Sequence, residues 1–224
     1  MSQALKLLPL ESLLKTGDVD HADWNHRPII GVIQRLRYRL VLALLGNSNF
    51  GRLLEAGYGS GVFMPELAGR CDELYGIDIH SKGSEVEKVL RRHGVRAQLS
   101  TASITELPFE DNYFDCVVTV SSLEFVEDIE GACHEVGRVL APGGVFVVIT
   151  PGHSPIVDWG LKILTGEDAG KDFGQRREAI VPALRREFVV EQLKFRPQLI
   201  HGLLHLYTGL RLGRPEERGC ATLQ

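Results

Sequence analysis

The chain has 224 residues, of which 44% are apolar and 24% are charged, and its formal net charge at pH 7 is −4. This composition is typical of an ordinary globular domain and excludes collagen-like and disordered chains. The negative net charge gives no overall attraction to nucleic acid. The length is sufficient for one α/β domain with a complete core.

The cysteines and the hydropathy pattern bear on compartment and membranes. Four cysteines occur without paired spacing, which argues against a disulfide framework and against a zinc site; they are Cys71, Cys116, Cys133 and Cys220. The first residues lack the long apolar core of a signal peptide, and no apolar run approaches the roughly 20 residues needed to span a bilayer. We therefore expect a cytoplasmic protein with no metal and no transmembrane segment.

The first 46 residues are expected to cover the main domain. Leucines up to Leu14 predict a short helix within the first 20 residues. The stretch 20–28 that follows is dense in side chains able to contact a ligand, including His21 and Trp24. Two interpretations remain open. The stretch is either a capped turn with Trp24 packed on the domain, or a lid in which His21 and Trp24 cover a bound ligand.

A helix is predicted from about residue 29 to residue 46, where Gly46 supplies a stop. Apolar residues recur at helical spacing, namely Ile29, Val32, Ile33, Leu36, Leu40 and Leu44. Arg35, Arg37 and Arg39 interleave with them. A basic amphipathic helix can rest on a membrane or bind an acidic partner. We prefer the simpler interpretation, a helix that covers the sheet and presents a solvated basic face.

The stretch 53–61 organises the chain and reads Leu-Leu-Glu-Ala-Gly-Tyr-Gly-Ser-Gly. Its apolar start predicts the end of a buried strand, and residues 62–68 predict a helix. Gly57, Gly59 and Gly61 can take positive φ and allow a ligand to approach the backbone closely. A strand, a glycine turn and a helix in this order form the entry of a nucleotide-binding βαβ unit.

A second strand is predicted over residues 73–79, and it ends in an acid, Asp78. Asp78 lies about twenty residues beyond the glycine turn, where an acid at the carboxyl edge of the sheet can accept hydrogen bonds from both ribose hydroxyls. A helix over residues 84–93 and a short strand over residues 95–99 complete the next crossover.

The glycine spacing distinguishes between families. A dinucleotide fingerprint needs a third glycine at the sixth position from Gly57, where this chain has Val62. The pattern instead resembles the first motif of the class I (Rossmann-like) S-adenosylmethionine-dependent methyltransferases of the small-molecule, type 11-like kind. The resemblance implies that the glycine turn passes under the methionine part of S-adenosyl-L-methionine and that Glu55 addresses its amino group.

Further motifs extend the resemblance over about residues 50–150. The segment 103–109 (Ser-Ile-Thr-Glu-Leu-Pro-Phe) is followed by a strand over 114–120, and Pro-Gly-Gly at 142–144 leads into a strand over 145–150. The family usually has an aspartate where this chain has Ser103, which weakens the expected hydrogen bond to the adenine amino group. The cofactor-binding residues implied by the resemblance are Glu55, Gly57, Tyr58, Gly59, Gly61, Asp78, Ile79, Ser103, Ile104 and Ser121.

Two residues are catalytic candidates because they follow strands at the edge where ligands bind in an open parallel sheet. Glu124 could orient or deprotonate a substrate, or it could be an acid at a helix start that backbone amides satisfy. His153 could act as a base near neutral pH, or it could be a solvated loop histidine. A helix over 129–140 separates the two.

The remainder predicts helices over 156–165 and 174–186, strands over 188–195 and 203–212, and a loose tail over 214–224. We expect an α/β fold with a doubly wound, mostly parallel sheet of seven strands, the last reversed as in the resembled family. The domain should cover residues 47–213, with a lid near 151–175 and N-terminal covering helices over 1–46.

The predicted reaction is direct displacement of the sulfonium methyl group by a small organic acceptor, which could be apolar or lipid-like. The absence of an Asn-Pro-Pro-Tyr-type segment after residue 120 argues against amino methylation of adenine, cytosine or glutamine. Two alternatives remain, a non-catalytic cofactor-binding module that recruits a partner and an NAD-type oxidoreductase. Peripheral membrane contact and nucleic acid are not expected, and the sequence predicts no oligomeric state.

Overall fold

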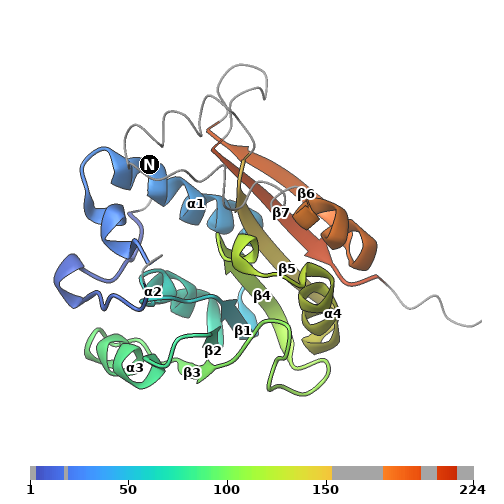
Figure 1. Ribbon diagram of the computed structural model, residues 1–224, viewed down its shortest axis with the longest axis horizontal. Helices are drawn as coiled ribbons and strands as arrows, with labels where there is room; N and C mark the ends of the chain where they lie inside the picture. Colours follow the sequence, from blue (N-terminus) through green and yellow to red (C-terminus); the bar gives the residue numbers. More distant parts are fainter. Residues whose placement is uncertain (1–3, 18–19, 153–178, 198–205, 216–224) are drawn as a thin grey trace, which may run out of the picture.

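The computed structural model describes residues 4–17, 20–152, 179–197 and 206–215, which form one α/β sandwich (Figure 1). The sheet of the described residues has seven strands in the order β3-β2-β1-β4-β5-β7-β6. The strands are β1 (Phe50–Ala56), β2 (Cys71–Asp78), β3 (Gln98–Thr101), β4 (Phe114–Val120), β5 (Leu140–Pro151), β6 (Val189–Arg196) and β7 (Tyr207–Gly213).

Strands β1 to β5 pair in parallel, and β7 is antiparallel to both of its neighbours, β5 and β6. The central strands are nearly continuous apolar runs because helices cover both of their faces. Successive residues alternate between the faces: Leu53 and Val118 join one core cluster, while Leu54 and Val117 join the other. The predicted mostly parallel sheet with a reversed last strand is confirmed.

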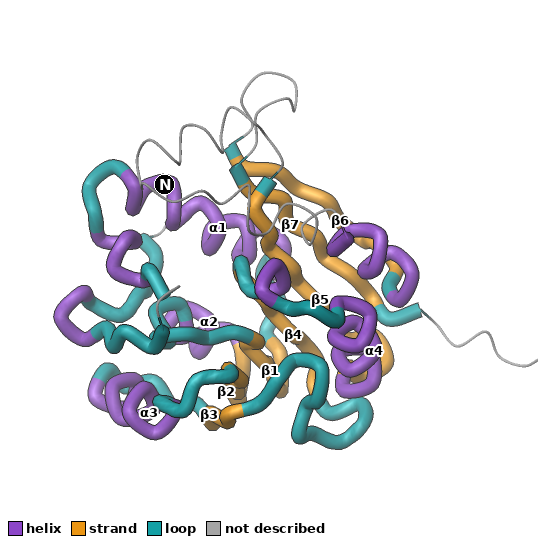
Figure 2. Tube along the Cα trace, viewed as in Figure 1, coloured by secondary structure: helices purple, strands orange, loops and turns teal. Residues whose placement is uncertain are grey.

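The helices divide between the two faces (Figure 2). Helices α1 (Ile30–Leu45), α2 (Met64–Leu67) and α3 (Gly83–Arg92) contribute to one core cluster, and α4 (Ile129–Val139) contributes to the other with the helical residues 179–187. No helix in the described part of the chain is long and apolar enough to cross a membrane.

Two expectations differ from the structure. The helix expected in the first 20 residues is missing from residues 4–17, which hold only a 3-10 turn at Leu10–Ser12. Pro9 disfavours helical backbone at Leu8, and the Leu8 amide instead donates to the carbonyl of Val62 at 3.0 Å. The third strand lies at residues 98–101 rather than 95–99, because its register is set by pairing with β2.

Helix α1 packs directly on the C-terminal strands. A Cβ on Gly209 of β7 would lie 2.7 Å from Leu40 and 2.9 Å from Leu44, so no side chain fits there. The last carbonyls of the helix accept hydrogen bonds from Lys194 of β6 and Arg211 of β7, which satisfies part of the helix C-terminus. The N-terminal helix and the C-terminal strands therefore form one packed unit.

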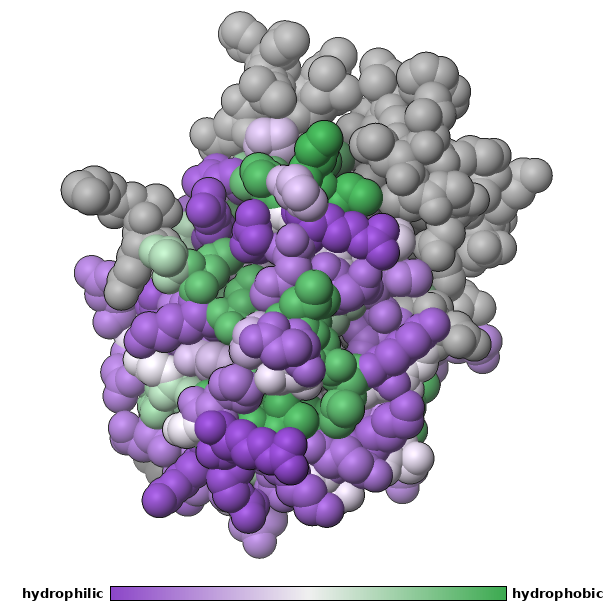
Figure 3. Space-filling view, turned by 90° about the vertical axis from the view of Figure 1, so that its left-hand side faces the viewer, coloured by the Kyte–Doolittle hydropathy of each residue, from purple (hydrophilic) through white to green (hydrophobic). Residues whose placement is uncertain are grey.

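The outer side of α1 is less polar than a solvated basic face. Ile29 and Val32, at the start of the helix, are 72% and 55% exposed. One lateral face of the molecule carries apolar surface bordered by hydrophilic residues (Figure 3). Apolar exposure on this scale is common on globular proteins and does not by itself mark an interface.

The close approach of α1 and β7 gives a stability prediction. Gly209→Ala should lower the free energy of unfolding by about 1–3 kcal/mol, because the added methyl group overpacks a fixed contact. Urea unfolding followed by circular dichroism measures the change. Gly69→Ala is the matched control, since a Cβ at Gly69 meets nothing within 4 Å. Equal stability of the two variants would contradict the tight packing.

Candidate active site

A cavity of about 920 Å³ opens at the carboxyl ends of the parallel strands, where the strand order reverses between β1 and β4. Ligands of open α/β sheets bind at this kind of switch point. The residues singled out from the sequence that line it are Glu55, Gly57, Tyr58, Gly59, Asp78, Ile79, Ser103, Ile104, Ser121, Glu124, His21 and Trp24. Gly61 is not among the lining residues, and His153 lies outside the described residues.

The glycine turn has the backbone that its sequence predicts. Gly57, Gly59 and Gly61 have φ angles of 82°, 53° and 71°, which L side chains rarely adopt. A Cβ on Gly57 would lie 2.6 Å from the Ser122 side chain, and one on Gly61 would lie 3.0 Å from Val86. At Gly59 the nearest atom is 3.8 Å away, so this glycine faces open space. Gly57 therefore allows the close contact with Ser122 after β4, Gly59 leaves space open in the cavity, and Gly61 allows the contact with α3.

Hydrogen bonds join the ends of β1 and β4 beneath the cavity. The Ser122 hydroxyl donates to the Ala56 carbonyl at 3.1 Å and lies 2.7 Å from the Thr119 hydroxyl. Ser121, between them, has a φ of 54°, an uncommon and strained conformation for a non-glycine residue. Its buried hydroxyl has no hydrogen-bond partner among the described residues. Such strain at a strand exit is typical of binding and catalytic sites.

Glu55 is a buried acid of the cavity with a strongly perturbed pKa. The side chain is 4% exposed, and its Oε2 atom has no hydrogen-bond partner among the described residues. Burial, and secondarily the charge of Asp78, raises the pKa of Glu55 to about 8, although Arg37 opposes the shift. A buried carboxyl group with an unused oxygen is suited to accept a hydrogen bond from a positively charged ligand group.

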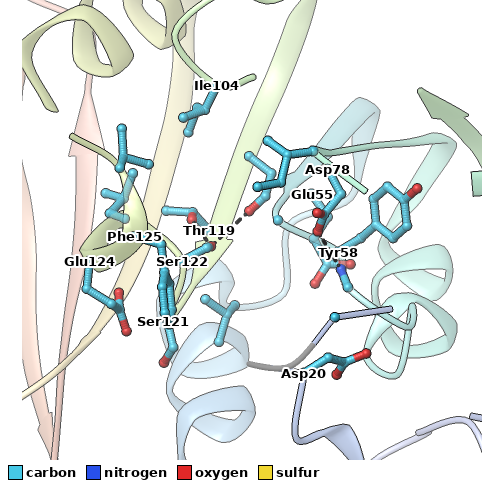
Figure 4. Close-up of a pocket in the computed structure, with 18 of the residues that line it drawn as sticks. Asp20, Glu55, Tyr58, Asp78, Ile104, Thr119, Ser121, Ser122, Glu124 and Phe125 are labelled. Atoms are coloured by element: carbon cyan, nitrogen blue, oxygen red, sulfur yellow. Dashed lines mark hydrogen bonds between the residues drawn. The ribbon is translucent and has the colours of Figure 1, made fainter. Parts of the chain in front are cut away.

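Asp78 ends β2 on the opposite side of the cavity from Glu124 (Figure 4). Its Oδ2 atom accepts a hydrogen bond from the Gly59 amide at 2.8 Å, and its Oδ1 atom accepts one from the His80 amide at 3.3 Å. These bonds place the carboxylate at the cavity wall and leave it lone pairs for a further ligand, since a carboxylate accepts about four hydrogen bonds.

Ile79 and Ile104 provide apolar surface beside Asp78. Ile79 is 81% exposed although it follows a buried strand, whereas Ile104 is 8% exposed. A flat apolar ring bound there would cover Ile79. The hydroxyl of Ser103 lies 2.7 Å from that of Thr105 and accepts a hydrogen bond from the Thr105 amide at 3.2 Å. Ser103 therefore already engages in a local turn.

The position of Arg37 differs from the expectation that α1 presents a solvated basic face. Its guanidinium lines the cavity, and its buried Nε atom has no hydrogen-bond partner among the described residues. One hydrogen bond of 3.1 Å runs from its Nη2 atom to the hydroxyl of Tyr38. Burial alone would lower the pKa of Arg37, but Tyr38, Tyr207 and Glu124 more than offset this effect and the pKa is raised. The cavity thus holds a permanent cation.

The β4 side of the cavity carries Glu124, which is 3% exposed and sits on the 3-10 turn Leu123–Phe125. Figure 4 shows Glu124, Phe125 and Ser121 together, away from Tyr58. Leu206 and Tyr207 of the C-terminal segment also line the cavity. This half therefore combines apolar and aromatic side chains with one buried acid.

The N-terminal segment closes another side. The rings of His21 and Trp24 stack with centroids 4.3 Å apart, and both residues line the cavity. The carboxylate of Asp20 accepts hydrogen bonds from the amides of Thr16 and Ala22, which fixes the backbone there. The two residues pack on one another and also face the cavity, and their role as a lid stays a prediction.

Sequence reasoning missed Arg37, and a signal for it was present. Ile33, Arg37, Leu40 and Leu44 follow one another at spacings of four, three and four, which places all four on one side of a helix. The apolar members of this series mark the inner face. Tyr207 and Gln34, which also line the cavity, had no comparable signal because their neighbourhood arises from the packing of α1 on β7.

Comparisons with known proteins agree with this geometry. Residues 54–148 match the family model described as a methyltransferase domain. This part of the chain is therefore similar to a methyltransferase domain, although the match covers less than half of the 224 residues. The matched residues run from β1 to β5 and include the glycine turn, Asp78 and the turn that carries Glu124.

Similar proteins come from several sources. A sterol 4-C-methyltransferase of Caenorhabditis elegans is 31% identical over 42% of this chain and 29% of its own length. A malonyl-[acyl-carrier protein] O-methyltransferase of Prosthecochloris aestuarii is 33% identical over 51% of this chain and 44% of its own. The crystal structure of the N-methyltransferase NodS from Bradyrhizobium japonicum shares the fold with a TM-score of 0.61 and 21% identity, covering 83% and 98% of the two chains. The match spans less than two thirds of the length of these curated relatives.

The pKa of Glu55 predicts a pH-dependent stability. The unfolded chain loses this proton near its ordinary pKa of 4.5 and the folded chain near 8, so raising the pH between these values favours unfolding. Glu55→Gln has no such proton to lose. Relative to the variant, the wild type should lose up to about 1.4 kcal/mol of stability per pH unit between pH 5 and 8. Urea unfolding across this range measures the difference.

The control is Glu110→Gln, which alters an exposed side chain and should follow the wild type at every pH. If the stability difference between wild type and Glu55→Gln stays constant from pH 5 to 9, the Glu55 side chain titrates at its ordinary pKa and the interpretation of this site is wrong.

Proposed function

We propose that the protein is an S-adenosylmethionine-dependent methyltransferase that transfers a methyl group to a small organic acceptor. The observation that carries this proposal is the presence of a buried carboxyl group and a guanidinium in the lining of one cavity. Glu55 offers an unused buried carboxylate oxygen, and Arg37 offers a guanidinium with one hydrogen bond to a described residue. Together they complement a free amino acid end, whose ammonium and carboxylate groups are one carbon apart.

The donor is oriented by three groups of residues. Glu55 accepts a hydrogen bond from the donor's ammonium group, and Arg37 donates to its carboxylate. Asp78 accepts hydrogen bonds from the ribose hydroxyls, and Ile79 and Ile104 enclose the adenine ring. The 81% exposure of Ile79 supports this arrangement, since a bound ring would remove that apolar surface from water. Ser103 contributes through its turn rather than through a charge.

The bound sulfonium supplies a methyl group that is already activated for displacement. The chain's own contribution is to exclude water and to hold the acceptor atom in line at about 3–3.5 Å. Glu124 is placed to accept a proton from an acceptor that must lose one, because its buried carboxyl group lines the acceptor half of the cavity. His153 remains a second candidate base, on the segment that follows β5.

A small organic acceptor with an apolar part fits the acceptor half. Phe125, Leu206 and Tyr207 line it and favour contact with apolar or aromatic groups. The names of the similar proteins mention transfer to carbon, oxygen and nitrogen. We therefore infer the class of acceptor from the cavity and leave the reacting atom to experiment.

We further propose that residues 1–46 act as a cover, that residues 47–213 form the methyltransferase domain, and that the protein works in the cytoplasm. The contacts of α1 with β5, β6 and β7 support the role of the N-terminal part as a cover that packs on the domain. Free thiols at Cys71, Cys116 and Cys133 are compatible with a reducing compartment.

Calorimetric titration tests the donor site. S-adenosylhomocysteine should bind with a dissociation constant on the order of micromolar, and NAD should not bind. Binding of NAD alone would favour the oxidoreductase alternative, and binding of neither would exclude the proposal. Binding of S-adenosylhomocysteine without methyl transfer from S-adenosylmethionine to any member of an acceptor panel would favour the non-catalytic module.

A matched pair of ligands tests the charge pair directly. Arg37→Met should weaken binding of S-adenosylhomocysteine by about 10–100-fold, because a charge-assisted hydrogen bond is lost. The variant should bind 5′-methylthioadenosine as the wild type does, since this ligand lacks the amino acid end. Glu55→Gln should show the same selectivity. An equal loss for both ligands would mean that the variants distort the whole cavity and would contradict the assigned contacts.

A further inference from the structure

Both the amide and the carbonyl group of Gly59, in the glycine turn, have side-chain partners. The Gly59 amide donates to Asp78 at 2.8 Å, and the Gly59 carbonyl lies 2.9 Å from Nε2 of His80. Asp78 is the last residue of β2, and His80 lies two residues beyond it. Gly59 itself lines the cavity, and a Cβ on it would meet no atom closer than 3.8 Å.

The hydrogen bonds determine the tautomer of His80. Its Nδ1 atom lies 3.1 Å from the backbone nitrogen of Lys82, which can only donate, so Nδ1 must accept. The proton of a neutral imidazole then sits on Nε2 and is donated to the Gly59 carbonyl. Each ring nitrogen thus has a hydrogen-bond partner, Nε2 also lies 4.0 Å from Oδ1 of Asp78, and the imidazole is oriented at both ends.

Other contacts keep the ring in place. The imidazole is 10% exposed and packs edge-to-face against Tyr58, with centroids 5.0 Å apart. The His80 carbonyl accepts a hydrogen bond from the Thr101 hydroxyl at 3.0 Å, which ties the segment to β3. Residue 80 is therefore tied to β3 as well as to the glycine turn.

We propose that His80 is a positioning residue for the methyl donor, acting through the Gly59 carbonyl rather than by touching the donor's reacting atoms. This inference rests on the proposed function of the same cavity. Gly59 has more backbone freedom than any other residue type, and ordering it costs free energy. The hydrogen bond with His80 orders Gly59 when the protein folds, before the donor arrives, so donor binding does not have to order the turn.

A set of substitutions separates this role from simple packing. His80→Gln keeps an amide N–H near the position of Nε2 and can still donate to Gly59. His80→Asn keeps an acceptor near the position of Nδ1 but cannot reach Gly59. His80→Phe keeps the ring contact with Tyr58 and loses both hydrogen bonds. The measurements are the dissociation constant of S-adenosylhomocysteine by calorimetry and the thermal unfolding midpoint of each variant without ligand.

His80→Phe and His80→Asn should bind S-adenosylhomocysteine about tenfold more weakly, and His80→Gln should bind within about threefold of the wild type. His93→Phe is the control, because His93 is exposed, bonds to Ser12 and lies outside the cavity, and it should bind as the wild type does. Should the phenylalanine variant fail to fold, the comparison of Gln with Asn decides alone.

Equal affinities for the Gln and Asn variants, whether both retained or both lost, would overturn the positioning role of the Gly59 contact. A shift in unfolding midpoint that accounts for the whole loss of affinity would do the same. Absence of binding to the wild type would instead refute the proposed function itself, so the two failures are distinguishable.

Discussion

The constraint on which the site depends is the burial of a carboxyl group and a guanidinium at the carboxyl edge of the central strands. A carboxyl group with an unused oxygen and a guanidinium with few hydrogen bonds are costly inside a protein. The pKa of Glu55 is raised to about 8, so the group is largely neutral until a cation approaches, and this lowers the free-energy cost of its burial. Arg37 cannot lose its proton and is stabilised by the neighbouring phenol Tyr38.

The conformation of the glycine turn is the second feature that shapes the site. It is maintained by hydrogen bonds to Asp78 and His80 and by the tie between β1 and β4 at Ser122. The turn thus borders the cavity in a form that needs no rearrangement to receive a ligand. Binding energy is then available for orienting the donor, which is the main task in a displacement reaction.

Much of this could be predicted from the sequence. The strand-turn-helix around Gly57 and the acid at Asp78 depend on local backbone chemistry, and local patterns report it faithfully. The prediction of a helix within the first 20 residues was wrong for residues 4–17. It relied on the spacing of the leucines, whereas Pro9 disfavours helical backbone at the preceding residue. Arg37, Gln34 and Tyr207 were missed because their convergence depends on how α1 meets β7, a tertiary contact without a local signature.

The contact of α1 with β7 has a consequence for how the protein is made. Arg37 reaches the cavity from a helix that packs against residues 207–213, and Gly209 allows the close approach. During synthesis the sheet from β1 to β5 can pair before these last strands leave the ribosome, since domains form as chain becomes available. The guanidinium therefore takes its place late, and the nascent chain carries Asp78 and the glycine turn well before Arg37 reaches the cavity.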